Sequence, residues 1–190
     1  DLLPLVEQKV KDVRQSDNRE LYRRLWWQYA EKRIDLYRAV GPCNRVLAVN
    51  CGATPHVAFA FLPSRMVFAN TIDVFPLQTA ACFAVLQSRV HETWARMSAS
   101  SMKDDLRYTP TDCFETFPFP AGWEANAALE AAGREYYEFR AALMVRNNEG
   151  LTKTYNRFHD PQERSPDIQT LRELHARMDA AVLAAYSWTD

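Results

Sequence analysis

The spacing of apolar positions changes twice along the chain, which divides it into a helical start, a strand-rich middle and a helical end. Residues 2–15 repeat apolar side chains every three or four positions, and this period predicts an amphipathic helix. The Ser-Asp-Asn run at 16–18 supplies side-chain oxygens that favour the start of a helix. A second helix is therefore predicted over 19–40, ended by the Gly-Pro pair that follows it.

The middle of the chain has the composition of β-strands. Segments 46–50, 56–62 and 66–75 are rich in Val, Phe and Ile, and short breaks of Gly, Pro and Ser separate them. This pattern predicts a small, mostly antiparallel sheet. One helix is predicted over 77–97. The prolines of Phe114–Pro120 exclude a helix there and indicate an extended segment.

The last third returns to a helical period. Helices are predicted over 124–147 and 166–186, and the polar stretch 151–165 between them is predicted to be a loop. The predicted fold class is α+β, with a small, mostly antiparallel sheet and packed helices, followed by a helical C-terminal extension. We divide the chain into a linker helix at 1–20, an α+β domain at 21–122 and the extension at 123–190.

Composition and charge narrow the classes of function. The 190 residues are 47% hydrophobic and 25% charged, as in ordinary globular proteins, and the formal net charge is −1. The charge is uneven: residues 1–45 carry +3, residues 46–120 carry −1 and residues 121–190 carry −3. Near-neutral charge argues against histone-like binding of nucleic acid, but it leaves room for one local basic face.

Motifs that would identify an enzyme are absent. The sequence contains no GxGxxG, no P-loop, no GxSxG and no HExxH pattern. A hydrolase that uses Asp104, Asp105 and His91 is the weakest of the hypotheses that we carry forward. The four cysteines form no CxxC pair, so we expect reduced thiols and a cytoplasmic location. No window reaches the roughly 18 to 20 apolar residues that a membrane span requires, and we expect no membrane partner.

Several sequence stretches together resemble a known family. They are Trp26-Trp27, Leu86–Trp94, Asp105–Thr109, Cys113–Pro120, Leu151–Asn156, Leu174-His175, Met178–Val182 and Ala185–Trp188. In order and spacing they resemble the C-terminal region of large single-chain DNA adenine-N6 methyltransferases, which include the type IIG and IIL restriction–modification enzymes. The resemblance runs from about Trp26 to Trp188. It implies that 21–122 is a target-recognition domain and that double-stranded DNA is a partner.

The resemblance also implies where DNA is read, since base-reading side chains in this family precede the closing FPFP segment. If residues 101–105 are extended, Ser101, Lys103 and Asp105 alternate onto one face. Lys103 would donate to guanine and Asp105 would accept from cytosine, with Asn70 as a further base-reading candidate. The expected contacts to the DNA backbone come from the following side chains: Arg89, Arg96, Arg107, Tyr108 and His56. From the residues alone, Arg96 is equally suited to an ion pair with Glu92.

The family's catalytic core lies N-terminal to this region and carries the S-adenosylmethionine loop and an (N/D)PP(Y/F) motif. Neither motif occurs here, so we expect no catalytic, cofactor-binding or metal residues in this chain, and S-adenosylmethionine only in the parent enzyme. Because the chain starts at Asp1, we expect a fragment that has the methyltransferase domain of the same chain upstream, with or without a fused nuclease. The alternative is a protein-interaction module whose helical end docks another subunit or domain.

Overall fold

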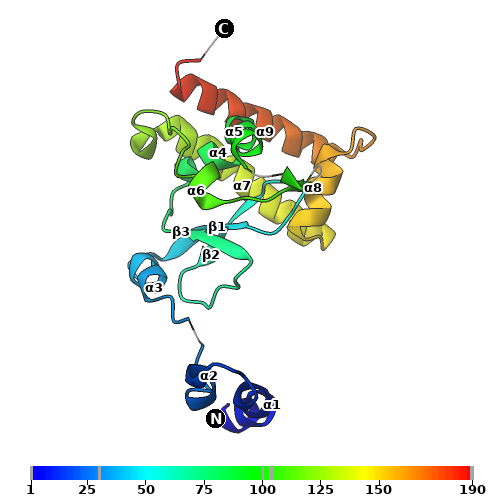
Figure 1. Cartoon of the computed structure of the whole chain (residues 1–190). Helices are drawn as coiled ribbons and strands as arrows, with labels where there is room; N and C mark the ends of the chain where they lie inside the picture. The colour runs from blue at the N-terminus through cyan, green and yellow to red at the C-terminus, as the bar shows by residue number, and fades with distance from the viewer. Residues whose placement is uncertain (1, 30, 100, 103–104, 189–190) are drawn as a thin grey trace. The chain divides into compact units, whose positions relative to one another are not determined.

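The structure is a computed structural model that describes residues 2–29, 31–99, 101–102 and 105–188; for residues 101 and 102 it describes the backbone only. The chain forms two compact units, Asp1–Ala39 and Val40–Asp190. The second unit contains the sheet and the long helices, and it combines α and β structure in one core (Figure 1). The predicted α+β class is confirmed.

In the first unit, one predicted helix differs from the structure. Helix α1 spans Leu3–Gln15, as expected, but the single helix predicted over 19–40 is wrong. The chain instead forms α2 at Glu20–Arg24 and α3 at Ile34–Val40. Aromatic residues crowd the intervening segment and are poor helix formers, and Arg33 adopts a positive φ of 47°, which a right-handed helix cannot contain. The apolar period alone did not reveal this interruption.

The predicted sheet is present and antiparallel. Strand β1 (Arg45–Asn50) lies between β2 (Phe59–Pro63) and β3 (Ile72–Phe75), with Leu47 opposite Phe61 on one side and Phe75 on the other. Alternate residues face opposite ways in a strand, so these three side chains point together into the core. β2 and β3 are both antiparallel to β1. The first residues of β2 and β3 therefore lie beside the last residues of β1.

The helix predicted over 77–97 is broken into two. Helix α4 (Ala80–Gln87) is buried along its whole length, whereas α5 (Arg89–Ser98) has one buried side. The break lies at Ser88, whose ψ of 158° is extended. Its hydroxyl donates to the carbonyl of Val85 and accepts from the backbone N–H of His91, so it ends one helix and caps the next.

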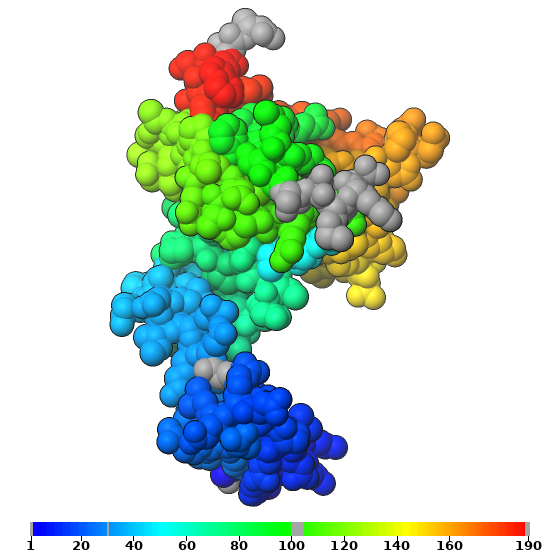
Figure 2. Space-filling view, viewed as in Figure 1, coloured from blue at the N-terminus to red at the C-terminus, as the bar shows by residue number. Residues whose placement is uncertain are grey.

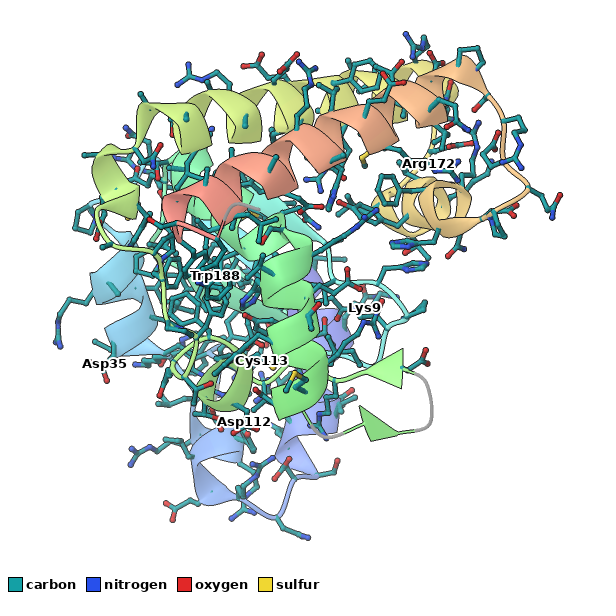
Figure 3. The ribbon with its side chains drawn as sticks, turned by 90° about the horizontal axis from the view of Figure 1, so that it is seen from above. Lys9, Asp35, Asp112, Cys113, Arg172 and Trp188 are labelled. Carbon is teal, nitrogen blue, oxygen red and sulfur yellow. The ribbon has the colours of Figure 1, made fainter. Side chains whose placement is uncertain are left out.

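The C-terminal helices pack against α4. Helix α7 (Ala127–Asn147) and α9 (Pro166–Ala185) lie side by side in both ribbon views (Figures 1 and 3), and both were predicted. Gly133 permits the close approach of α7 to α4, because a Cβ there would lie 2.1 Å from the carbonyl oxygen of Ala80. The helices that follow residue 123 therefore share the core of the sheet.

The loop predicted at 151–165 is wrong over most of its length, because Leu151–His159 forms helix α8. Thr154, Tyr155 and Phe158 are its buried side, and the remaining positions except Leu151 are polar, which concealed the helical period. The guanidinium of Arg172 holds α8 in place by donating to the carbonyls of Arg157 and Phe158 at 3.2 and 2.9 Å (Figure 3). α8 is thus fixed to α9 and not part of a free loop.

Candidate nucleic-acid interface

Several predicted site residues converge on the loop of residues 51–58, which connects β1 to β2. Thr54 forms a bridge to Leu106, with reciprocal backbone hydrogen bonds of 3.1 and 3.0 Å. The backbone N–H of Cys51 donates to the carbonyl of Thr71 at 3.0 Å, which brings the exposed Asn70 to the same end of the sheet. We call this surface the loop edge: loop 51–58 together with Asn70, Arg96 and Asp105.

Arg96 fastens α5 to this loop. Its guanidinium donates to the carbonyl of Pro55 at 2.7 Å and to the carboxylate of Glu92 at 2.7 and 3.0 Å. The ion pair one turn away, which was the alternative interpretation of Arg96, is therefore present. Arg96 is nevertheless exposed, so its cation still contributes positive charge to the surface beside Pro55.

Strands β4 (Ser101–Met102) and β5 (Asp105–Leu106) correct the expected geometry of the base-reading segment. They pair antiparallel, with Ser101 opposite Leu106 and Met102 opposite Asp105. Ser101 and Asp105 therefore lie on two paired strands, and the alternation expected along one extended strand does not occur. Lys103 and Asp104 lie outside the described residues. Asp105 is half-buried, and the neighbouring Arg107 is exposed.

Arg89 lies apart from the loop edge. It is seven residues from Arg96, which is about 10 Å along the axis of α5. Its guanidinium is 3.6 Å from the carboxylate of Asp179 on α9, and its backbone N–H donates to the same carboxylate at 2.9 Å. Arg89 and Arg96 were both expected to contact the DNA backbone. In the structure they contact different elements, α9 and loop 51–58.

Tyr108 belongs to the core, which corrects its predicted role as a contact to the DNA backbone. Its side chain is 2% exposed, and its hydroxyl is 3.0 Å from Nε2 of His91, which is fully buried. Burial lowers the pKa of His91 to about 3 and raises the pKa of Tyr108, so both groups stay neutral. His91 consequently has no access to a substrate, and the hydrolase hypothesis loses its base.

His56 connects the loop edge to α8. Its Nε2 is 3.0 Å from Oδ1 of Asn156, and its ring stacks on that of His159 at a centroid distance of 4.5 Å and an interplanar angle of 4°. Sequence reasoning missed Asn156 and His159 because it assigned α8 to a loop. The i, i+3 spacing of these two residues, next to the apolar Tyr155 and Phe158, was the available signal.

The buried Arg140 fixes the two segments that carry His56 and Asn156. Arg140 donates to the hydroxyl of Tyr155 at 2.8 Å and to the carbonyl of Phe59 at 2.6 Å, and Gln87 accepts from the backbone N–H of Phe59 at 2.9 Å. Tyr155 precedes Asn156 on α8, and Phe59 follows His56 by three residues. The core thus fixes the two elements that meet at His56.

A groove of about 260 Å³ begins at the loop edge and runs along the face of the sheet that points away from α4. Apolar and polar side chains line it together. The apolar ones are Ala48, Val49, Ala58, Ala60, Leu62, Ile72 and Leu151, and the polar ones are Asn50, Thr54, His56, Thr152 and Tyr155. In Figure 2 the cyan surface of the loop, the green surface of the β5 region and the gold surface of α8 adjoin on one side of the second unit. The described residues hold no group of three metal ligands, and none of their helices is long and apolar enough to cross a membrane.

Comparisons with known proteins found a family model, a sequence relative and a similar solved structure. The model of the family "MmeI, target recognition domain" matches residues 3–121. Over 137 residues, which are 66% of the chain, the sequence is 29% identical to DNA methyltransferase A of Bacillus subtilis (strain 168). The fold is similar over the whole chain, with a TM-score of 0.70 and 19% identity, to a solved structure of the type IIL restriction–modification enzyme MmeI in complex with DNA.

Both relatives are much longer than this chain. It covers 14% of DNA methyltransferase A and 24% of the MmeI chain in the solved structure. The family match lies on the first two thirds of the chain; it includes the whole loop edge and does not include α8.

Proposed function

Because the chain belongs to the family of the MmeI target recognition domain, we propose that it binds duplex DNA at the loop edge and reads a base sequence there. The observation that carries this proposal is the convergence of Asn70, Arg96 and Asp105, from three separate parts of the sequence, on loop 51–58, which itself carries His56. A recognition surface needs such a collection of donors, acceptors and positive charge at one edge.

Each side chain has chemistry suited to one kind of contact. The amide of Asn70 is exposed and matches the donor and acceptor pattern of adenine in the major groove. The carboxylate of Asp105 accepts from the exocyclic amine of cytosine. Arg96 and Arg107 carry exposed guanidinium groups that bind phosphate oxygens. Lys103 and Ser101 complete the proposed base-reading set on sequence grounds.

The catalytic step belongs to other parts of a parent enzyme. We infer that the parent is a cytoplasmic DNA adenine-N6 methyltransferase that uses S-adenosylmethionine, and that its methyltransferase domain is upstream in the same chain. This chain has neither the cofactor loop nor the (N/D)PP(Y/F) motif of such a domain. An enzyme of this kind must extrude the target adenine from the duplex, and the recognition domain would position that duplex.

A fluorescence anisotropy titration of this chain with a labelled duplex tests DNA binding. We expect the logarithm of the binding constant to fall linearly with the logarithm of the salt concentration, because bound Lys and Arg release counterions from DNA. In the parent enzyme, Lys103→Ala should change the preferred target sequence. Absence of salt-dependent binding, together with unchanged site choice in that variant, would refute the proposed function.

A second candidate, the docking of a protein, is favoured by one apolar groove of about 530 Å³ between α5 and the end of α9. Met97 is 79% exposed and Trp188, labelled in Figure 3, is 59% exposed at this groove, which Leu183 also lines. Exposed apolar patches of this kind often mark protein contacts. If the groove docks the upstream domain, Met97→Ser should weaken methylation by the parent without altering DNA binding by this chain.

A further inference from the structure

Helix α8 presents polar, exposed side chains at the loop edge although it lies beyond the matched recognition region. Asn156 and His159 are exposed on one side of α8, and Tyr155 and Phe158 on the other side are buried. Both exposed residues contact His56 on the loop, one by a hydrogen bond of 3.0 Å and the other by ring stacking at 4.5 Å. α8 therefore continues the surface of the loop edge.

The contact with His56 determines which atoms of Asn156 face outward. Oδ1 of Asn156 accepts the hydrogen bond from Nε2 of His56, so the amide nitrogen keeps both of its N–H donors for another partner. Among the described residues, no acceptor pairs with that amide nitrogen or with the ring nitrogens of His159. The two side chains thus offer hydrogen-bond donors in positions that stacking and packing hold fixed.

The electrostatic surroundings favour an anion at this place. Arg96 of α5 contacts the same loop through Pro55, and it is more exposed than Glu92, the carboxylate that it pairs with at 2.7 Å. Lys153 lies one turn before Asn156 on the exposed side of α8; it pairs with Glu149 at 3.3 Å, and its own side chain is the more exposed member of that pair. The position is rigid as well, because the buried Arg140 joins Tyr155 of α8 to the start of β2.

We propose that Asn156 and His159 donate hydrogen bonds to phosphate oxygens of the DNA that lies on the loop edge, so that α8 is a further element of the DNA interface. This inference rests on the proposed function. It assigns a DNA contact to a helix outside residues 3–121, the region that matches the family. The ring of His159 is partly covered although the residue is exposed, and this partial burial together with the neighbouring His56 lowers its pKa to about 4, so the ring is neutral near pH 7 and acts as a donor without charge.

Contacts from neutral donors and contacts from arginine or lysine should differ in the salt dependence of DNA binding. A neutral hydrogen bond to phosphate raises affinity but releases no counterion, so its loss lowers the binding constant at every salt concentration and leaves the salt dependence unchanged. Loss of a cation such as Arg96 instead reduces the slope of that dependence. The two classes of contact are therefore separable in one set of titrations.

The experiment is an anisotropy titration of the 190-residue chain with a labelled duplex at four salt concentrations. Asn156→Ala and His159→Ala should each raise Kd about 3- to 10-fold without changing the salt slope. His159→Gln keeps a neutral donor and should recover most of the lost affinity. The matched control is Asn44→Ala, because Asn44 is exposed at the opposite end of β1 from the loop edge.

The outcomes separate this inference from the function on which it rests. If the unaltered chain binds DNA and both alanine variants bind within twofold of it, the role of α8 is refuted and the proposed function stands. If the unaltered chain shows no salt-dependent binding, both are refuted. A loss of affinity in Asn44→Ala equal to that in Asn156→Ala would also overturn the inference, as would a reduced midpoint in urea that accounts for the weaker binding.

Discussion

The guanidinium of Arg140 lies 2.8 Å from the hydroxyl of Tyr155, and this contact is made in the centre of the protein. The same guanidinium donates to the carbonyl of Phe59, and the described residues place no carboxylate in an ion pair with it. Four aromatic rings lie 5.1 to 5.7 Å from its charge: those of Phe83, Tyr136, Tyr137 and Tyr155. The rings and neutral oxygens replace the water that the cation lost on burial.

We expect Arg140→Met to lower the free energy of unfolding by about 2 to 4 kcal/mol, because the carbonyl of Phe59 and the hydroxyl of Tyr155 lose their donor inside the core. Urea denaturation measures the change. Arg146→Met is the control on the same helix: Arg146 is exposed and pairs with Asp167 at 2.8 Å, so its loss should cost less than about 1 kcal/mol. Equal losses in the two variants would contradict a structural role for the buried network.

Gly133→Ala should destabilise the protein by at least about 2 kcal/mol, since the new Cβ would lie 2.1 Å from the carbonyl oxygen of Ala80 and force α7 away from α4. Thermal or urea unfolding monitors this effect. Gly150→Ala provides the comparison, because no atom lies within 4 Å of its Cβ position and its φ is −83°. Gly150 is the N-cap of α8, where Ala is less favourable than Gly, so a loss of about 1 kcal/mol or less is expected there. The prediction fails if Gly133→Ala is as stable as the unaltered chain.

The sequence predicted secondary structure best in the segments whose apolar residues are also the buried ones. β1 alternates between a face in the core and a face beneath the groove, and α9 buries Ile168, Leu171, Leu174, Met178 and Val182 at helical spacing. Both were predicted. α4 is buried on all sides, and apart from Gln87 at its end it has no polar positions to mark its phase. The extended residue Ser88 therefore went unnoticed, and two helices were predicted as one.

The candidate site was less predictable because its members depend on tertiary contacts. Nothing in the local sequence distinguishes Tyr108, which pairs with His91 in the core, from an exposed tyrosine that binds phosphate. The approach of His56 to Asn156 joins residues 100 positions apart, and no local pattern contains that information. Arg96 was predicted both as an ion-pair partner and as a DNA contact, and its geometry is compatible with both.

The stability of the protein should fall as the pH decreases below 6.5, because His91 has a lower pKa in the folded state, about 3, than the ordinary value of 6.5. The unfolded chain binds a proton at His91 between these values and the folded chain does not, so protons favour unfolding. One such group contributes up to about 1.4 kcal/mol per pH unit. Between pH 6.5 and 5 few carboxylates titrate, which makes this the window to measure.

The test of this pH dependence compares urea unfolding of the unaltered chain and His91→Met at several pH values in that window. The variant should be less stable near pH 7, since Tyr108 loses its partner, but its stability should fall less steeply as the pH decreases. His159→Gln provides a second comparison, because the pKa of His159 is also lowered, to about 4. Parallel pH profiles for the unaltered chain and His91→Met would show that His91 is not the group responsible.

Arg96 and Arg89 should differ in their effect on DNA binding although they lie on one helix. Arg96 contacts the loop edge through Pro55, whereas Arg89 faces Asp179 on α9. Arg96→Gln should weaken binding and reduce the salt slope by about 0.9, the amount expected for one phosphate contact. Arg89→Gln should leave the slope unchanged. Arg177→Gln should do so too, because Arg177 forms an ion pair with Glu135 at 2.8 Å that resembles the ion pair of Arg96.

Anisotropy titrations over a range of salt concentrations measure all three variants. An equal reduction of slope in Arg89→Gln and Arg96→Gln would mean that DNA extends along the whole of α5 and is not confined to the loop edge.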